Sequence, residues 1–197
     1  MKRKGIFLFF TAICCLIFAF TISACADKNN SDKLGDTNSS EILVAYFSCT
    51  NHTEGVAEKI ADITGGTLYE ITPAIPYTAE DLNYNADCRA NREQNDANAR
   101  PEISGNVGNM SEYEVVYLGY PIWWGEAPKI IYTFLESYDF TGKTVVPFCT
   151  SGSSGIGNSA DNLHGSASGA TWLSGRRFSS SPSQSEVEEW LNGLIQG

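Results

Sequence analysis

Three short segments of the chain carry the residue types that could bind a ligand. The first covers residues 48–53, where the hydroxyls of Ser48, Thr50 and Thr53 come directly before a predicted helix. The first N–H groups of a helix have no partner within it, so hydroxyls placed beside them can bind a phosphate dianion without Lys or Arg. The segment is neither a P-loop nor a Gly-rich dinucleotide turn. Simple capping of the helix by Thr53 or Ser48 is the other interpretation of the same residues.

The second segment is Pro121-Ile-Trp-Trp-Gly-Glu126. The side chains of adjacent tryptophans point in different directions, so one can fill the core while the other forms a wall on which a flat aromatic ligand stacks. Gly125 allows a positive φ angle, which lets the backbone come close to a ligand. The alternative is that both tryptophans belong to the core.

The third segment, Thr150-Ser-Gly-Ser-Ser-Gly-Ile-Gly157, consists mainly of small residues. Small side chains leave backbone N–H groups accessible and let a planar ligand lie close, although a flexible surface loop has the same composition. No Gly-x-Ser-x-Gly motif occurs in the chain, and there are only two histidines. We therefore predict no catalytic triad and no metal site.

The elements around these segments indicate how they come together. Apolar runs predict five strands, at 42–47, 67–71, 115–119, 144–149 and 170–173. Helical spacing of apolar residues predicts helices at 53–64, 128–135 and, after a capping box of Ser185 and Glu188, 185–195, with a weaker one at 159–164. Strands that alternate with helices indicate an α/β fold with a mainly parallel sheet. Ligands bind beyond the carboxyl ends of such strands, so we expect the three segments to face one crevice.

Residues 72–110 do not fit this alternation. They are rich in Asn, Asp, Arg and Ala, and they contain one predicted helix at 79–92. A connection of this length in a compact domain has a function of its own or packs as an insertion. Tyr77 and Tyr84 are candidates for covering the crevice.

The N-terminus resembles a bacterial lipoprotein signal. Lys2-Arg3-Lys4 precedes an apolar run over residues 6–22, and small residues come just before Cys25. This pattern predicts a signal peptide over 1–24, lipid modification of Cys25, a flexible tether over 25–41 and a folded domain over 42–197 outside the cytoplasm; an uncleaved anchor is the alternative. Cys49, Cys88 and Cys149 remain in the domain, and we expect at least two of them to be buried thiols.

Composition excludes one large class of partner. Hydrophobic residues make up 42% of the 197 residues and charged residues 18%, which is typical of a globular protein. The chain has 13 basic and 23 acidic residues, for a net charge of −10. General binding to nucleic acid requires the opposite balance.

Taken in order, the three segments resemble the flavodoxin family. The stretch 46–53 is similar to the family's FMN-phosphate loop, and Trp124-Gly125-Glu126 resembles its loop with a stacking tryptophan. The resemblance implies FMN as cofactor and a flavodoxin-like three-layer sandwich around five parallel strands in the order 2-1-3-4-5. Asn51 stands where the family usually has Gly, and Asn tolerates the left-handed φ that this turn needs.

The resemblance also implies residue roles. The FMN phosphate would be held by Ser48, Thr50, Asn51, His52 and Thr53. One side of the isoalloxazine would be lined by Pro121, Ile122, Trp123, Trp124 and Gly125. The other side would be lined by Thr150, Ser151, Gly152 and Gly155.

The implied function is electron transfer with FMN, in which the peptide at Gly125 hydrogen-bonds the half-reduced flavin. The acidic surface favours docking to a basic redox partner, which we expect at the membrane. One alternative is an FMN-dependent reductase that takes hydride from NAD(P)H and reduces quinones. Another is a binding lipoprotein that kept the fold but lost the cofactor.

Overall fold

The computed structural model describes residues 41–85 and 87–196. The predicted signal peptide, the lipidation site at Cys25 and nearly all of the predicted tether lie outside these residues. Within the described part, no helix combines the length and the apolar character that a bilayer span requires.

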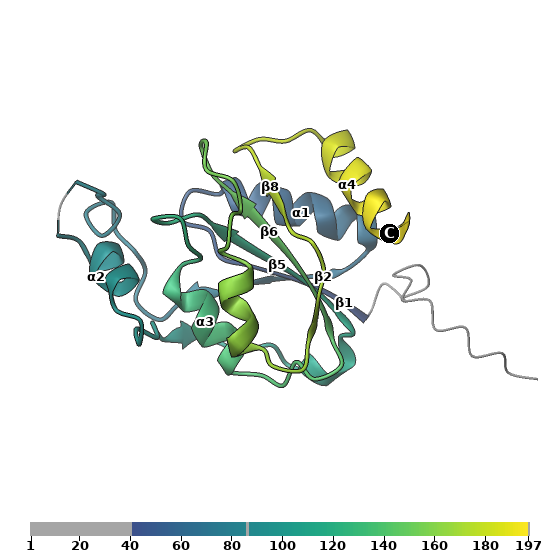
Figure 1. Ribbon diagram of the computed structural model, residues 1–197, viewed down its shortest axis with the longest axis horizontal. Coiled ribbons are helices and arrows are strands. Elements are labelled where there is room, and N and C mark those ends of the chain that lie inside the picture. Colours follow the sequence, from purple (N-terminus) through teal and green to yellow (C-terminus); the bar gives the residue numbers. More distant parts are fainter. Residues whose placement is uncertain (1–40, 86, 197) are drawn as a thin grey trace, which may run out of the picture. The chain divides into compact units, whose positions relative to one another are not determined.

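A parallel sheet forms the centre of the domain (Figure 1). Its strands are β1 (Ile42–Tyr46), β2 (Thr67–Glu70), β5 (Val115–Pro121) and β6 (Thr144–Thr150), in the order β2-β1-β5-β6. Two short strands, β7 (Thr171–Trp172) and β8 (Arg176–Phe178), share the fifth position and both run parallel to β6. The predicted strand order is therefore confirmed, with the fifth strand split in two.

The split in the fifth strand has a local cause. β7 pairs with β6 as far as Val145, and β8 resumes the pairing at Phe148. Pro147 lies between these stretches and has no N–H to donate. A Cβ atom on Gly175, which connects the two short strands, would lie 2.8 Å from the carbonyl oxygen of Pro147. This close backbone contact takes the place of regular pairing.

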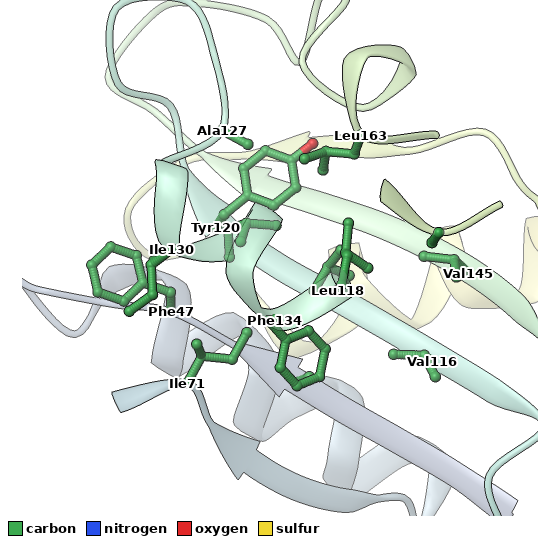
Figure 2. Close-up of a cluster of buried hydrophobic side chains, with 14 of the residues drawn as sticks. Phe47, Ile71, Val116, Leu118, Tyr120, Ala127, Ile130, Phe134, Val145 and Leu163 are labelled. Atoms are coloured by element: carbon green, nitrogen blue, oxygen red, sulfur yellow. The ribbon is translucent and has the colours of Figure 1, made fainter. Parts of the chain in front are cut away.

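Helices cover both faces of the sheet (Figure 1). α1 (His52–Thr64) and α4 (Gln184–Gln196) pack on one face, where Val44, Val56 and Trp190 belong to the same buried cluster. α3 (Lys129–Glu136) and the 3-10 helix η4 (Asp161–Ser166) cover the other face. Figure 2 shows the cluster beneath them, with Phe134 of α3 and Leu163 of η4 directed toward the sheet.

Two predicted helix boundaries were wrong. Ser183 caps α4, because its Oγ accepts a hydrogen bond from the N–H of Glu186 at 3.1 Å, so the capping box of Ser185 and Glu188 does not form. The weak helix predicted at 159–164 is the 3-10 helix η4 instead. In both regions several residues that can cap a helix, such as Ser, Asn or Asp, lie close together, and tertiary packing selects one start.

The predicted helix at 79–92 in the insertion was also wrong. The Asp81 carboxylate accepts hydrogen bonds from the N–H and the hydroxyl of Thr78, which turns the chain locally. The helix α2 covers only Arg89–Asn95, and the Sγ of Cys88 accepts from the N–H of Asn91 at its start. The short strands β3 (Thr72–Pro73) and β4 (Ile103–Ser104) pair antiparallel and close the base of the insertion, and the 3-10 helix η3 (Met110–Glu112) leads into β5.

Candidate functional site

The three segments meet at the carboxyl ends of β1, β5 and β6, as expected. They enclose a pocket of about 490 Å³, a volume typical of cofactor sites. Ten predicted residues line it: Ser48, Thr50, His52, Thr53, Pro121, Ile122, Trp123, Thr150, Ser151 and Gly152.

The first loop keeps the N-terminus of α1 open. Asn51 is the N-cap residue and has φ 63°, so it adopts the left-handed conformation that its residue type tolerates. Its side chain makes no capping hydrogen bond. Thr53, only 1% exposed, directs its hydroxyl to the hydroxyl of Thr150 at 2.8 Å. Neither the Asn51 nor the Thr53 side chain accepts a hydrogen bond from the first N–H groups of α1. Capping of the helix therefore does not account for the residue types in this loop.

The charges around the pocket favour an anion. Among the described residues no acidic side chain lines it, although the chain carries a net charge of −10. Glu54, which follows the loop, accepts a hydrogen bond from the hydroxyl of Tyr46 at 3.3 Å instead. Burial and then this carboxylate raise the pKa of Tyr46. The first loop therefore offers hydroxyls and N–H groups, and the carboxylate of Glu54, which follows it in the chain, accepts a hydrogen bond from Tyr46.

The two tryptophans have different environments. Trp123 is 4% exposed, and its ring makes edge contacts with Phe47 and Tyr77 at 5.5 and 5.3 Å between centroids. Trp124 is 42% exposed, and its ring lies 4.5 Å from that of Tyr84, which belongs to the insertion. The two tryptophans thus differ in burial as predicted, but the predicted division of roles was wrong: the buried Trp123 lines the pocket, whereas the exposed Trp124 does not.

Trp124 and Gly125 form the tip of a tight turn. Trp123 and Glu126 exchange both of their backbone hydrogen bonds, at 2.9 and 3.0 Å. The φ angles of Trp124 and Gly125 are 49° and 82°, which identifies a two-residue type I′ turn. Gly suits this geometry, whereas a left-handed tryptophan is unfavourable and must be held in place by its surroundings.

Arg177 of β8 holds the third loop. Its guanidinium donates to the carbonyl oxygens of Ser151 and Gly152 at 2.6 and 2.9 Å and to the Ser151 hydroxyl at 3.2 Å. Three hydrogen bonds thus hold the start of the loop at Ser151 and Gly152, so this part is not a loose surface segment, although its composition allowed that interpretation. Residue-type patterns could not show this, because Arg177 lies 25 residues further along the chain.

Four predicted residues do not line the pocket itself: Asn51, Trp124, Gly125 and Gly155. Four others do: Cys49, Leu82, Tyr84 and Ser180. Tyr77 and Tyr84 were both candidates for covering the crevice. Tyr84 lines the pocket, whereas Tyr77 packs beneath the guanidinium of Arg89 and donates its hydroxyl to Glu93. Burial raises the pKa of the Cys49 thiol to about 12. Leu82 and Ser180 carry no sequence signal, since only the fold brings them to the pocket.

Comparison with known proteins agrees with this arrangement. The family model described as flavodoxin matches residues 41–194. The chain belongs to the flavodoxin family. Among curated proteins, the comparison found no match to this flavodoxin-family chain.

Solved structures resemble this family member over nearly the whole described domain. A candidate flavoprotein from Bacteroides eggerthii is 46% identical, with a TM-score of 0.74, and the match covers 79% of this chain and 98% of that one. A candidate flavoprotein from Bacteroides uniformis is 43% identical, with a TM-score of 0.75 and coverages of 79% and 99%. A Lactobacillus acidophilus flavoprotein, solved in complex with FMN, shares the fold at 24% identity and a TM-score of 0.60, with coverages of 77% and 99%.

Proposed function

We propose that this flavodoxin-family protein binds FMN in the pocket and serves as an electron-transfer protein anchored outside the cytoplasm. The observation that carries the proposal is the first loop, where hydroxyls and an uncapped helix N-terminus form a cradle without carboxylates in a strongly acidic chain. Such a cradle can bind a phosphate dianion without Lys or Arg, because the free N–H groups and the helix dipole favour negative charge. Family membership and the FMN complex of the Lactobacillus protein agree with it.

The residues of the pocket suit both parts of FMN. Ser48, Thr50 and Thr53 would hold the phosphate with the N–H groups that begin α1, and His52 lies beside them, its Nδ1 3.2 Å from the Thr50 hydroxyl. The flat ring system requires an apolar surface, which Ile122 and Trp123 supply. When bound, FMN supplies the redox chemistry, and the protein binds and orients it.

The second candidate function is an FMN-dependent NAD(P)H:quinone-type reductase. The observation that favours it is the position of Leu82 and Tyr84, which bring side chains of the insertion to the pocket. Tyr84 is 52% exposed, so aromatic surface remains available to a second flat molecule. The third candidate is a cofactor-free binding lipoprotein, which requires that the pocket take no flavin.

A membrane location for this protein rests on the N-terminal sequence. A lipid on Cys25 would keep the domain at the outer face of the membrane, so we propose a membrane-associated redox partner. The acidic surface would speed encounter with a basic partner more than it would tighten binding. Radiolabelled palmitate incorporated into wild type but not into Cys25→Ala would support this proposal, and equal labelling would contradict it.

Spectroscopy of the purified protein tests the three functions. We expect flavin absorption bands after addition of FMN, and accumulation of one-electron-reduced flavin during stepwise anaerobic reduction. Direct passage to the two-electron-reduced form, together with NADH or NADPH oxidation above background, would favour the reductase. A protein that binds no FMN would contradict both and leave the binding lipoprotein.

A further inference from the structure

Gln94 connects the insertion to the segment that follows β5. Its side-chain amide Nε2 donates to the carbonyl oxygens of Trp123 and Ala127, both at 3.2 Å. Its Oε1 accepts a hydrogen bond from the N–H of Lys129 at 3.0 Å. One side chain thus satisfies three backbone groups, two of them acceptors and one a donor, on both sides of the Trp124–Gly125 turn.

These hydrogen bonds matter because the turn, although closed by two backbone hydrogen bonds, holds an unsuitable residue. The left-handed conformation is unfavourable for tryptophan, unlike Gly or Asn, so neighbouring contacts must help to impose it on Trp124. Gln94 fixes the chain on both sides of the turn. On the opposite side, Asn162 of η4 donates to both carboxylate oxygens of Glu126 at 2.9 Å.

The insertion touches the same turn at a second point. The ring of Tyr84 lies against Trp124, and Tyr84 itself lines the pocket. Nothing in the local sequence of the insertion indicates these contacts, because Gln94 and Tyr84 lie 30 and 40 positions before Trp124.

We propose that Gln94 is a positioning residue for the cofactor site, and that the insertion is coupled to cofactor binding through it. This inference rests on the proposed function. In the described part of the chain the hydrogen bonds of the Gln94 side chain go to backbone groups, so it acts by holding Trp123, which lines the pocket, and the turn beside it in place. The insertion, residues 72–110, then forms part of the binding unit and is more than an appendage on the surface.

Coupling of this kind works in both directions. If the insertion stabilises the pocket, FMN in the pocket must stabilise the insertion by the same free energy. α2 has seven residues, too few for a stable helix without tertiary contacts. FMN binding should therefore slow amide exchange in α2, although α2 contributes no residue to the pocket lining.

The test compares Gln94→Ala with Asn95→Ala in the full-length protein. Asn95 is the neighbouring amide in α2, and in the described part of the chain its side chain bonds to Asn91 of the same helix and to no other residue. FMN affinity is measured by fluorescence quenching, and amide exchange by mass spectrometry with and without FMN. We expect the Kd for FMN to rise about tenfold in Gln94→Ala and less than about twofold in Asn95→Ala. FMN should slow exchange of α2 in the wild type and in Asn95→Ala, but not in Gln94→Ala.

Amide exchange without FMN separates this inference from the proposed function. In the cofactor-free protein, Gln94→Ala should speed amide exchange at Lys129, because the N–H of Lys129 loses its hydrogen-bond acceptor. This effect does not depend on whether the protein is able to bind FMN. A wild-type protein that binds no FMN would contradict the proposed function and the coupling. Unchanged exchange at Lys129 in Gln94→Ala would contradict the role of Gln94 in holding the chain beside the turn. Wild-type affinity and wild-type protection in Gln94→Ala would overturn the whole inference. If Gln94→Ala fails to fold, Gln94→Glu serves instead, because it keeps the acceptor for Lys129 and loses both donors; unchanged FMN affinity in it would equally overturn the inference.

Discussion

The hydroxyls of Thr53 and Thr150 lie 2.8 Å apart and join two loops that do not follow neighbouring strands. Thr53 lies in the first turn of α1, directly after the loop that follows β1, and Thr150 ends β6, while β5 lies between these strands in the sheet. Both threonines are buried, with exposures of 1% and 5%. The hydrogen bond therefore fixes the width of the pocket between its first and third loops.

Thr53→Val should destabilise the protein and weaken FMN binding. Valine keeps the shape of threonine but leaves the Thr150 hydroxyl buried without this partner, which costs about 1–2 kcal/mol. Urea unfolding of the cofactor-free protein measures the loss. The matched control is Thr133→Val, because the Thr133 hydroxyl is buried in α3 without a hydrogen-bond partner in the described part of the chain. That change should be neutral or stabilising, and equal destabilisation by both variants would contradict the role of the Thr53 contact.

Trp124→Asn should stabilise the cofactor-free protein while weakening FMN binding. Trp124 does not line the pocket itself, but its ring packs against Tyr84, which does. Asn followed by Gly is the preferred pair for a type I′ turn, so relief of the left-handed tryptophan is worth up to about 1 kcal/mol. The lost contact with Tyr84 offsets part of this gain. Thermal unfolding and FMN titration of the same samples check the two effects. Higher stability together with weaker FMN affinity would show that Trp124 serves binding at a cost in stability. A variant with lower stability and unchanged FMN affinity would contradict this role.

Cys49 should react slowly with thiol reagents. Burial raises the pKa of its thiol to about 12, so at pH 8 only about one molecule in ten thousand carries the reactive thiolate. Alkylation by iodoacetamide, followed by peptide mass mapping, should be much slower at Cys49 than at an exposed cysteine. Because Cys49 lines the pocket, bound FMN should slow the reaction further. Rapid labelling that FMN does not change would place Cys49 outside the pocket.

Glu136 should contribute stability that acid removes. Arg100 donates to its carboxylate at 2.6 and 2.8 Å and Ser166 at 2.7 Å, and the hydrogen bonds from Arg100 are the main cause of its lowered pKa. A carboxyl with a lower pKa in the folded state stabilises above its unfolded pKa, near 4.5, and loses this effect as the pH falls through the folded value. The pair is largely exposed, so Glu136→Gln should cost less than about 1 kcal/mol at pH 7. The difference from wild type should shrink below pH 4.5, and a constant difference would contradict the linkage.

The sequence by itself determined the framework of the domain and the chemistry of its loops. Unbroken apolar strands such as residues 42–47 must be buried on both faces, and this requirement leads to a parallel sheet with its loops at one edge. Cys88 and Cys149 are buried, as expected of at least two of the three cysteines. The left-handed Asn51 was also predictable, because few other residues tolerate that conformation.

Only the tertiary structure decided what surrounds those loops. Arg177, Gln94 and Tyr84 reach the pocket region from segments far along the chain, and their residue types do not reveal these destinations. The helix predicted at 79–92 in the insertion was wrong for a different, local reason. Hydrogen bonds from Thr78 to the Asp81 carboxylate outweigh helix propensity there. Local patterns depend on neighbours in the chain, whereas a polar side chain acquires its partner from the backbone groups that folding leaves unsatisfied beside it.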